Sequence, residues 1–186
     1  IIMKPLRIRP YLVLGDGNTW KCKDLDKPPF SVGAVVSVGG GVHNDNPNRA
    51  YLHLGILDRT GNKAVEKMTE VMIQAIEFMT TWLKKESESL QEPTPRAGGG
   101  RPPVQSILVH CRGGMNRSPA TIAAFLMASE NLSWDEAMAD IQRIRKKCRP
   151  RPEYRVAAEQ AVSLWRQRRH GENQEDDNDM TVMVEE

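Results

Sequence analysis

Apolar and polar positions divide the chain into short apolar runs and longer segments with apolar residues three or four positions apart. The short runs are bounded by glycine, proline or loop residues and predict strands. They lie at residues 11–14, 32–38, 51–57 and 104–110, and residues 19–22 offer a further short strand. The longer segments, at 63–85 and 117–130, predict helices that face the core. Strands that alternate with helices indicate an α/β fold.

Two more helices are predicted beyond residue 130. Ser133 and Glu136 have the spacing of a capping box, in which each side chain bonds a backbone N–H of the other residue, so a helix opens there. Its inward-facing residues are Ala137, Met138, Ile141 and Ile144. The last helix starts near Pro152 and ends at about Arg169. For the first long helix, Asn62 is the expected cap.

Stretches rich in proline and glycine separate these elements. Residues 24–29 contain two prolines, which favour an irregular connection over a helix. Residues 86–103 are polar, with four prolines and three consecutive glycines, and predict a flexible loop. A linker to a second domain is the competing interpretation. Because the strand and helix that follow need the first half's sheet to bury them, we expect one domain over residues 1–170, with a mixed, mostly parallel sheet flanked by helices.

Composition indicates what class of protein this is and in which compartment to expect it. With 39% apolar residues in a chain of 186, the sequence can bury one sizeable core, and it has no apolar run long enough to span a membrane. No secretory signal or lipidation motif is apparent, and Met3 resembles a natural start. The three cysteines, at 22, 111 and 148, have no metal-like spacing and fit a reducing compartment. We therefore expect a cytoplasmic protein, with the nucleus as the alternative, and neither a metal nor a cofactor.

The most informative stretch is residues 104–130, where a turn joins a strand to a helix. Cys111 closes the strand and Arg117 opens the helix. Gly113 and Gly114 allow the backbone between them to curl so that successive N–H groups point inward, and the positive end of the helix points to the same place. A phosphate group fits there, because Arg117 can hold two oxygens while Cys111 faces the phosphorus. The same donors stabilise a thiolate, so we expect the pKa of Cys111 to lie well below that of a free thiol.

The spacing Cys-x5-Arg is a weak motif when it stands alone, because a buried structural cysteine beside a glycine turn produces the same pattern. Here it is accompanied by His110 before the cysteine and by Ser118 and Pro119 after the arginine. A predicted strand and a predicted helix flank it on the two sides. This combination favours a thiolate nucleophile over a structural cysteine.

The segment HCRGGMNRSPA, residues 110–120, resembles the active-site motif of the cysteine-based protein phosphatases, most closely that of the small dual-specificity branch. Residues 8–15 resemble the first strand of that family, and the order of elements up to about residue 165 is similar. The resemblance implies hydrolysis of phosphotyrosine and phosphoserine/threonine in proteins through a cysteinyl-phosphate intermediate, without a metal.

The same resemblance implies roles for individual residues. His110 helps to orient and ionise Cys111, and Ser118 eases release of the thiolate in the second step. The phosphate group is held by the loop residues Arg112, Gly113, Gly114, Met115, Asn116 and Arg117.

A general acid must lie above the pocket, because a tyrosine or serine oxygen is a poor leaving group unless it is protonated as the P–O bond breaks. Asp58 follows the strand at 51–57 and precedes a helix, which matches the place of the acid in the family; Asp45 is a weaker candidate. An aspartate there is also a common turn or capping residue. His43 is better explained as a surface residue, since no second metal ligand has a suitable spacing.

Other functions are open at this stage. Asn116 stands where the branch usually has a small residue, and in this it is similar to the cysteine-dependent RNA 5′-triphosphatases, although their Thr-Gly after the arginine is Ser118-Pro119 here. The loop carries Arg112 but no lysine, so it lacks the doubly basic pattern of inositide phosphatases. A phosphate-binding scaffold without activity is a further alternative, which the intact Cys111 and Arg117 oppose.

Charge is unevenly distributed toward the C-terminus. Residues 143–155 contain seven basic side chains, which form either a solvated face or a patch for an anionic partner. A phosphoprotein is the expected partner, and nucleic acid is disfavoured without being excluded. Residues 171–186 contain seven acidic side chains and no basic one. A disordered tail accounts for them, and the alternatives are a short strand at 181–184 or docking of the tail on the basic residues.

Overall fold

The computed structural model describes residues 3–39, 46–56, 61–91 and 104–181, with side chains described as far as residue 170. Within these ranges the chain forms five strands, four α-helices and two one-turn 3-10 helices. In chain order they are β1 (Leu6–Arg9), β2 (Leu12–Gly15), η1 (Thr19–Lys21), η2 (Lys23–Asp26), β3 (Val32–Val38), β4 (Ala50–Leu54), α1 (Asn62–Ser89), β5 (Ser106–His110), α2 (Arg117–Ser129), α3 (Trp134–Ile144) and α4 (Pro152–Thr181).

The five strands form one mixed sheet in the order β1-β2-β5-β3-β4. Only the β1–β2 pair is antiparallel, and β2, β5, β3 and β4 run parallel to one another. Every residue of β3 and β5 is buried, as expected for strands covered on both faces. The predicted mixed, mostly parallel sheet flanked by helices is therefore confirmed, and β5 is its central strand.

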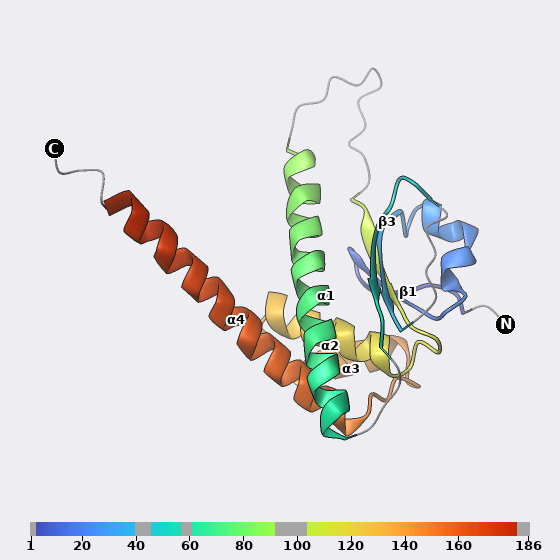
Figure 1. Ribbon diagram of the computed structural model, residues 1–186. Coiled ribbons are helices and arrows are strands. Elements are labelled where there is room, and N and C mark those ends of the chain that lie inside the picture. Colours follow the sequence, from blue (N-terminus) through green and yellow to red (C-terminus); the bar gives the residue numbers. More distant parts are fainter. Residues whose placement is uncertain (1–2, 40–45, 57–60, 92–103, 182–186) are drawn as a thin grey trace, which may run out of the picture.

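The two faces of the sheet are covered unequally (Figure 1). One face packs on α1 and α2, and carries alternate strand residues such as Leu14, Val36 and Val109 into the larger core. The opposite face carries Val35 and Leu108 into a smaller cluster beneath the short blue helices η1 and η2. This alternation follows from the two-residue period of a strand.

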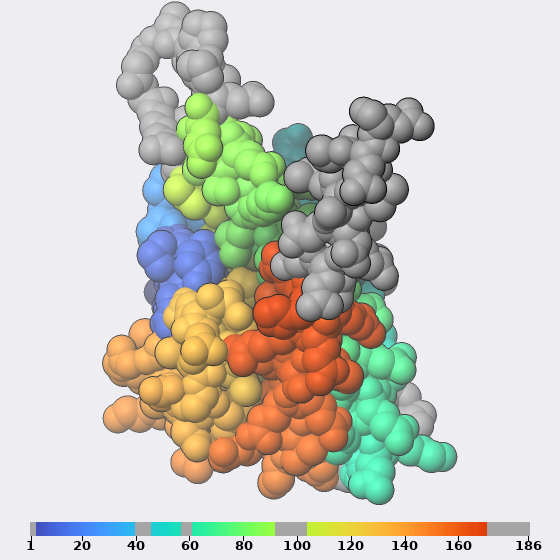
Figure 2. Space-filling view, turned by 90° about the vertical axis from the view of Figure 1, so that its left-hand side faces the viewer, coloured from blue at the N-terminus to red at the C-terminus, as the bar shows by residue number. Residues whose placement is uncertain are grey.

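Helix α4 joins the helical layer together. Figure 2 shows its first half between α1 on one side and the α2–α3 region on the other. Ala157, Ala158 and Ala161 are fully buried there, because small side chains allow helices to approach closely. None of the helices in the described ranges combines the length and the apolar character needed to cross a membrane.

The N-terminal region differs from the prediction in three places. The strand predicted at residues 11–14 is present as β2, but Ile8 and Arg9, which the family resemblance joined to it, belong to the separate strand β1. A turn at Pro10, which has no N–H for a strand ladder, separates the two strands. Residues 19–22, expected as a strand, form η1, whose hydrogen bonds are local to the turn. Residues 24–29, expected to be irregular, contain part of η2, which ends before the two prolines.

The middle of the chain shows smaller shifts of element boundaries. β4 ends at Leu54 rather than at residue 57, because Gly55 follows it. Gly61 takes the cap position of α1, so Asn62 is the first helical residue and not the cap. The helix continues through residues 86–89, which the sequence analysis assigned to the loop, since no proline interrupts it before residue 93. Residues 92–103 lie outside the described residues.

The capping box that opens α3 is confirmed. Ser133 accepts from the backbone N–H of Glu136, and the Glu136 carboxylate accepts from the backbone N–H of Ser133. Of the four residues predicted to face inward, Ala137, Met138 and Ile141 are buried, but Ile144 is 44% exposed because the helix ends at that residue.

The last helix is longer than predicted. It passes Arg169 and continues to Thr181, so its backbone includes much of the acidic segment. No proline interrupts this segment, and one glycine, Gly171, costs only about 1 kcal/mol in a helix. At 1.5 Å per residue, the acidic positions of this helix, from Glu172 to Asp179, lie about 30–40 Å along it from Pro152. The helical part of the tail therefore does not fold onto the basic residues of its own chain, and α4 projects from the body (Figure 1).

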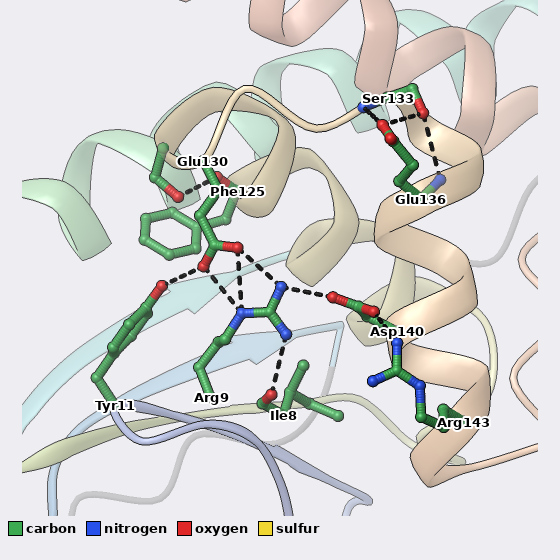
Figure 3. Close-up of polar contacts among 10 residues, drawn as sticks. Ile8, Arg9, Tyr11, Phe125, Glu130, Ser133, Glu136, Asp140 and Arg143 are labelled. Carbon is green, nitrogen blue, oxygen red and sulfur yellow. Dashed lines mark hydrogen bonds and ion pairs between the residues drawn. The ribbon is translucent and has the colours of Figure 1, made fainter.

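A polar cluster joins the β1–β2 hairpin to the helical layer (Figure 3). Arg9 donates through Nε and Nη2 to the Glu130 carboxylate at 2.9 and 2.8 Å, and through Nη2 to Asp140 at 2.6 Å. The Tyr11 hydroxyl donates to Glu130 at 2.5 Å. Because these side chains are largely shielded from water, the charged hydrogen bonds are stronger than those of an exposed ion pair.

We predict that Glu130→Gln lowers the free energy of unfolding by about 1.5–3 kcal/mol at neutral pH, the range for hydrogen bonds to a charged group. Urea unfolding followed by circular dichroism measures this. The control is Glu159→Gln, which removes the exposed partner of Arg155 and leaves stability almost unchanged. Equal unfolding midpoints for the two variants would show that the cluster contributes no more than a surface pair.

The pH dependence of this difference has a defined sign. The hydrogen bonds from Arg9 lower the pKa of Glu130, more than burial raises it. A carboxylate with a lowered pKa in the folded state stabilises the protein above its unfolded pKa, and that stabilisation is lost as the pH falls through the folded pKa. The gap between wild type and Glu130→Gln therefore shrinks in acid.

Candidate active site

The loop between β5 and α2, residues 111–116, is called the phosphate loop below. It leaves the carboxyl end of the central strand, since β5 ends at His110. His110 lies beside Gly15 of β2 and Ser37 of β3 in the sheet register. Cys111 is 2% exposed. The structure thus places the loop where the sequence analysis expected it, at the edge where open α/β sheets bind ligands.

The outer side of the phosphate loop is bound by the α3–α4 connection, residues 145–151. Arg145 Nη2 donates to the carbonyl of Gly113 at 3.3 Å. The backbone N–H of Arg149 donates to the carbonyl of Met115 at 2.9 Å. These bonds occupy loop carbonyls with donors from outside and keep them turned away from the cysteine.

Two more carbonyls of the loop are also engaged on the outside. Arg112 accepts from the backbone N–H of Gly17 at 3.2 Å, and the Cys148 thiol approaches the carbonyl of Gly114 at 3.7 Å. Gly114 has φ +60°, and a Cβ there would lie 2.7 Å from the carbonyl oxygen of Gly15. This position therefore requires glycine, for its backbone angle and for the close approach of β2.

On the inner side, donors converge on the cysteine sulfur. The Ser118 hydroxyl donates to Cys111 Sγ at 3.2 Å. The backbone N–H groups of Gly114 and Ser118 also interact with this sulfur. A loop with its carbonyls held outward and its N–H groups directed inward is an anion-binding site, because the donors are already aligned.

These donors change the acidity of Cys111. Burial raises the pKa of the thiol, but the Ser118 hydroxyl, the two backbone N–H groups and the charge of Arg117 together outweigh it. The pKa of Cys111 is lowered as a result, in the direction expected from the sequence. A thiolate is the nucleophilic form of cysteine, so the site favours nucleophilic chemistry.

The start of α2 is left open for an anion. Asn116 occupies the cap position, but its side chain makes no capping hydrogen bond. Instead its Oδ1 accepts from the backbone N–H of Arg151 at 2.9 Å, which ties the loop to the α3–α4 connection. The first turn of the helix holds no acidic residue. Its N–H groups and the positive end of its dipole are therefore available to a bound phosphate.

Arg117 is fixed by the ends of two other strands. Its Nη1 donates to the carbonyls of Gly39, after β3, and Ile56, after β4, both at 3.1 Å. The residue is 8% exposed, and these bonds use one nitrogen of the guanidinium. Gly39 has φ +62°, and a Cβ there would lie 2.0 Å from that nitrogen. The guanidinium has further N–H groups, which can bind phosphate oxygens as a fork.

The second buried cysteine differs from the first. Burial raises the pKa of Cys148 to about 11, and the negative charge of the Cys111 thiolate adds to this effect, while Arg145 opposes it. Cys148 therefore stays protonated near neutral pH, when Cys111 is the more acidic thiol. Both are free thiols, as is Cys22.

The sequence prediction named three side chains in the loops that follow β3 and β4. Asp58, Asp45 and His43 all lie outside the described residues, so the structure does not test the general acid. His110 is buried behind the phosphate loop, and its role in ionising Cys111 stays a prediction. Ser118 and Arg117 do meet Cys111 around one point.

Other residues of the site were not singled out from the sequence. Gly39 and Ile56 hold Arg117, and Gly17 holds the loop from the β2 side. Among them only Gly39 has a sequence signal, because it opens a run of three glycines after the predicted strand at 32–38. That run does not indicate a contact with an arginine 78 positions away. Every residue has a backbone carbonyl, so contacts of this kind cannot be predicted from the residue type.

Comparison with known proteins agrees with this geometry. The family model "Dual specificity phosphatase, catalytic domain" matches residues 30–167. "Protein phosphatase Slingshot homolog 3" of Homo sapiens is 29% identical over 148 residues, which are 78% of this chain and 19% of that protein. The chain thus spans about a fifth of the length of this relative.

Solved structures share the fold. A leucine rich repeat and phosphatase domain containing protein from Entamoeba histolytica has a TM-score of 0.65 at 17% identity, over 88% of this chain and 94% of that one. PTPMT1 in complex with PI(5)P has a TM-score of 0.61 at 19% identity, over 89% and 99%. These likenesses concern the fold alone, whereas the family model covers most of the residues described above. The chain belongs to the dual-specificity phosphatase catalytic domain family.

Proposed function

We propose that this protein is a phosphoprotein phosphatase that hydrolyses phosphotyrosine and phosphoserine/threonine in two steps. The observation that carries the proposal is the convergence of Arg117, Ser118 and inward N–H groups on the Cys111 sulfur. These groups suit a phosphoryl group. The donors can bind its three negatively charged non-bridging oxygens, while the thiolate faces the electrophilic phosphorus.

In the first step the Cys111 thiolate attacks phosphorus, an S–P bond forms and the P–O bond to the substrate breaks. Arg117 and the N–H groups of the phosphate loop hold the three non-bridging oxygens throughout, so the charge of the transition state meets donors that are already in place. In the second step water attacks phosphorus, the S–P bond breaks and phosphate leaves. The Ser118 hydroxyl, 3.2 Å from the sulfur, stabilises the departing thiolate.

Asp58 supplies and removes the protons in this proposal. It gives a proton to the leaving oxygen of the substrate in the first step and takes one from the attacking water in the second. In the sequence it follows Ile56 by two residues, and the carbonyl of Ile56 holds Arg117. This neighbourhood supports Asp58 over Asp45 as the acid.

The structure also bears on the alternative function as an RNA 5′-triphosphatase. That alternative depended on Asn116, whose side chain accepts from the backbone of Arg151. A structural role for Asn116 explains its presence without an RNA substrate. The inactive-scaffold alternative is opposed by the lowered pKa of Cys111 and by the anchoring of Arg117.

The first prediction concerns the anchoring of Arg117. Gly39→Ala forces the guanidinium away from its position, and a displacement of about 1 Å in an active site costs roughly 100-fold in rate. We expect kcat/KM for an aryl phosphate to fall by about this factor. Gly55→Ala is the matched control, since a Cβ at Gly55 meets no atom within 4 Å. Equal activity of the two variants would mean that Arg117 tolerates the displacement.

The second prediction concerns the acidity of Cys111. The pH profile of alkylation by iodoacetate has a midpoint below that of an ordinary cysteine, and Ser118→Ala moves it upward because a donor to the thiolate is removed. Mass spectrometry of digests identifies the labelled residue. Cys148, with its pKa raised to about 11, stays unlabelled at neutral pH. A midpoint that does not move in Ser118→Ala would exclude the hydroxyl as a cause.

The third prediction tests the function itself. Wild type, Cys111→Ser and Asp58→Asn are assayed on a phosphotyrosine peptide, a phosphothreonine peptide, an aryl phosphate with a good leaving group, and a 5′-triphosphate RNA. Cys111→Ser abolishes turnover. Asp58→Asn slows peptide hydrolysis by about 10²–10⁴-fold but slows aryl phosphate hydrolysis far less, because a good leaving group needs no proton.

If the RNA is the preferred substrate and Asp58→Asn leaves activity unchanged, both the phosphoprotein substrate and the role of Asp58 as the acid would be wrong. Turnover that survives in Cys111→Ser would overturn the covalent mechanism.

A further inference from the structure

The C-terminal part of α4 carries its charges in two separate groups. Residues 166–169, called the basic block, include three arginines: Arg166, Arg168 and Arg169. Residues 172–179, called the acidic block, include five acids: Glu172, Glu175, Asp176, Asp177 and Asp179. Both blocks belong to one helix, and Gly171 lies between them. The basic block is at the level where α4 leaves the body, and the acidic block is on the part that projects (Figure 1).

Within one helix these two blocks cannot pair with each other along their length. Their centres are about 12 Å apart at 1.5 Å per residue. Only residues three or four positions apart come together on a helix, such as Arg168 and Glu172 where the blocks meet. A basic residue ahead of an acidic one is also the less favourable order for such a pair. Most of the charge in the two blocks therefore calls for a partner outside the helix.

The acidic block also lies at the unfavourable end of the helix. The C-terminal end of a helix dipole is negative, so carboxylates there destabilise the helix, and the last turn of α4 has no basic residue to offset them. Residues 172–179 are all polar, so this part gains no stability from an apolar face. A positively charged surface beside the acidic block would stabilise it.

The body is hollowed on both sides of the basic block. Arg169 stacks over the ring of Trp165 at 5.1 Å, and the two residues separate a hollow of about 370 Å³ between α1 and α4 from one of about 350 Å³ between the end of α2 and α4. Lys84 and Arg168 line the first hollow. Among the described side chains Arg169 has no acidic partner, and Arg168 has only an exposed pair with Glu77 at 3.3 Å, which contributes little. These cations are available to a second helix.

We propose that two copies of this chain associate through antiparallel α4 helices, with the basic block of each copy beside the acidic block of the other. A two-fold axis between residues 171 and 172 places residues 166–169 of one copy beside residues 174–177 of the second. Gly171 then lies at the crossing, where the absence of a side chain allows the two helices to approach closely. The arginines of each copy lie near the C-terminal end of the other helix, where positive charge is favourable.

A second copy fits both blocks at once, because they have opposite signs and lie on either side of the same point of one helix. A different acidic or basic partner would match only one of them. Leu164 is 43% exposed and comes to the level of Met180 of the second copy, so apolar residues lie at the ends of the charged contact. The contact begins about 20 Å along α4 from Pro152, so it leaves the phosphate loop uncovered. The inference does not depend on the proposed phosphatase function.

The test is analytical ultracentrifugation of the full chain over a dilution series. At low salt we expect wild type to form a species of twice 20.9 kDa. Its dissociation constant rises by at least about 10-fold in about 0.5 M salt, because the charges are screened.

Two charge-reversal variants identify the contact. Arg168→Glu/Arg169→Glu reverses the basic block, and Glu175→Arg/Asp176→Arg/Asp177→Arg reverses the acidic block. Arg166 is kept because it donates to the carbonyl of Met127 and to Asn131. Each variant alone is monomeric, since like charges now face each other in its own pair. An equimolar mixture of the two variants forms the dimer again, because each reversed block meets a complementary block. Damage to the fold would not be repaired by mixing.

The matched control is Lys63→Glu/Lys67→Glu, which reverses two exposed cations at the opposite end of α1 and leaves the dissociation constant at the wild-type value. Three results would overturn the proposal. They are a wild type that stays monomeric at low salt, a dimer that survives in both reversal variants, and a mixture of folded variants that does not associate.

Discussion

The phosphate loop depends on hydrogen bonds made on its outer side. In a loop without such bonds, consecutive N–H groups would not all point to one place, because each peptide group can satisfy its carbonyl and its N–H by hydrogen bonds to water. In this protein the carbonyls are bound from outside by Gly17 and by the α3–α4 connection, and Asn116 binds the same connection through its side chain. The site is therefore organised before any substrate arrives, which is the condition for electrostatic catalysis.

The sheet and the helices supply this arrangement from distant parts of the chain. The order β2-β5-β3-β4 brings the ends of four parallel strands to one edge, so that Gly39 and Ile56 can hold Arg117. Helix α3 ends, and α4 begins, beside the phosphate loop, so the short connection between them reaches the loop carbonyls. The polar cluster around Arg9 joins the edge hairpin to α2 and α3, and thereby supports both. Stability and site geometry are coupled through the same elements.

The sequence predicted those features that residue type determines. Buried strands such as β3, the capping box at Ser133 and the Cys111–Arg117 spacing all follow from local pattern, and each is present. It could not predict the anchors of Arg117 or the binding of the loop by residues 145–151, because backbone groups make most of these contacts and every residue has them. Asn116 is a further example. Its residue type suggested an RNA substrate, but in the structure its side chain accepts a hydrogen bond from the backbone of Arg151.

The most direct measurement is the binding of tungstate, a phosphate mimic, to Cys111→Ser protein with and without Asn116→Ala, by isothermal titration calorimetry. If the loop is organised from outside, removal of the Asn116–Arg151 bond lets the loop relax and weakens tungstate binding by about 10-fold or more. The free energy of unfolding then falls by no more than about 0.5–1.5 kcal/mol, the range for one hydrogen bond. Equal affinity of the two proteins would contradict the account, because the loop would then hold its shape without its outer bonds.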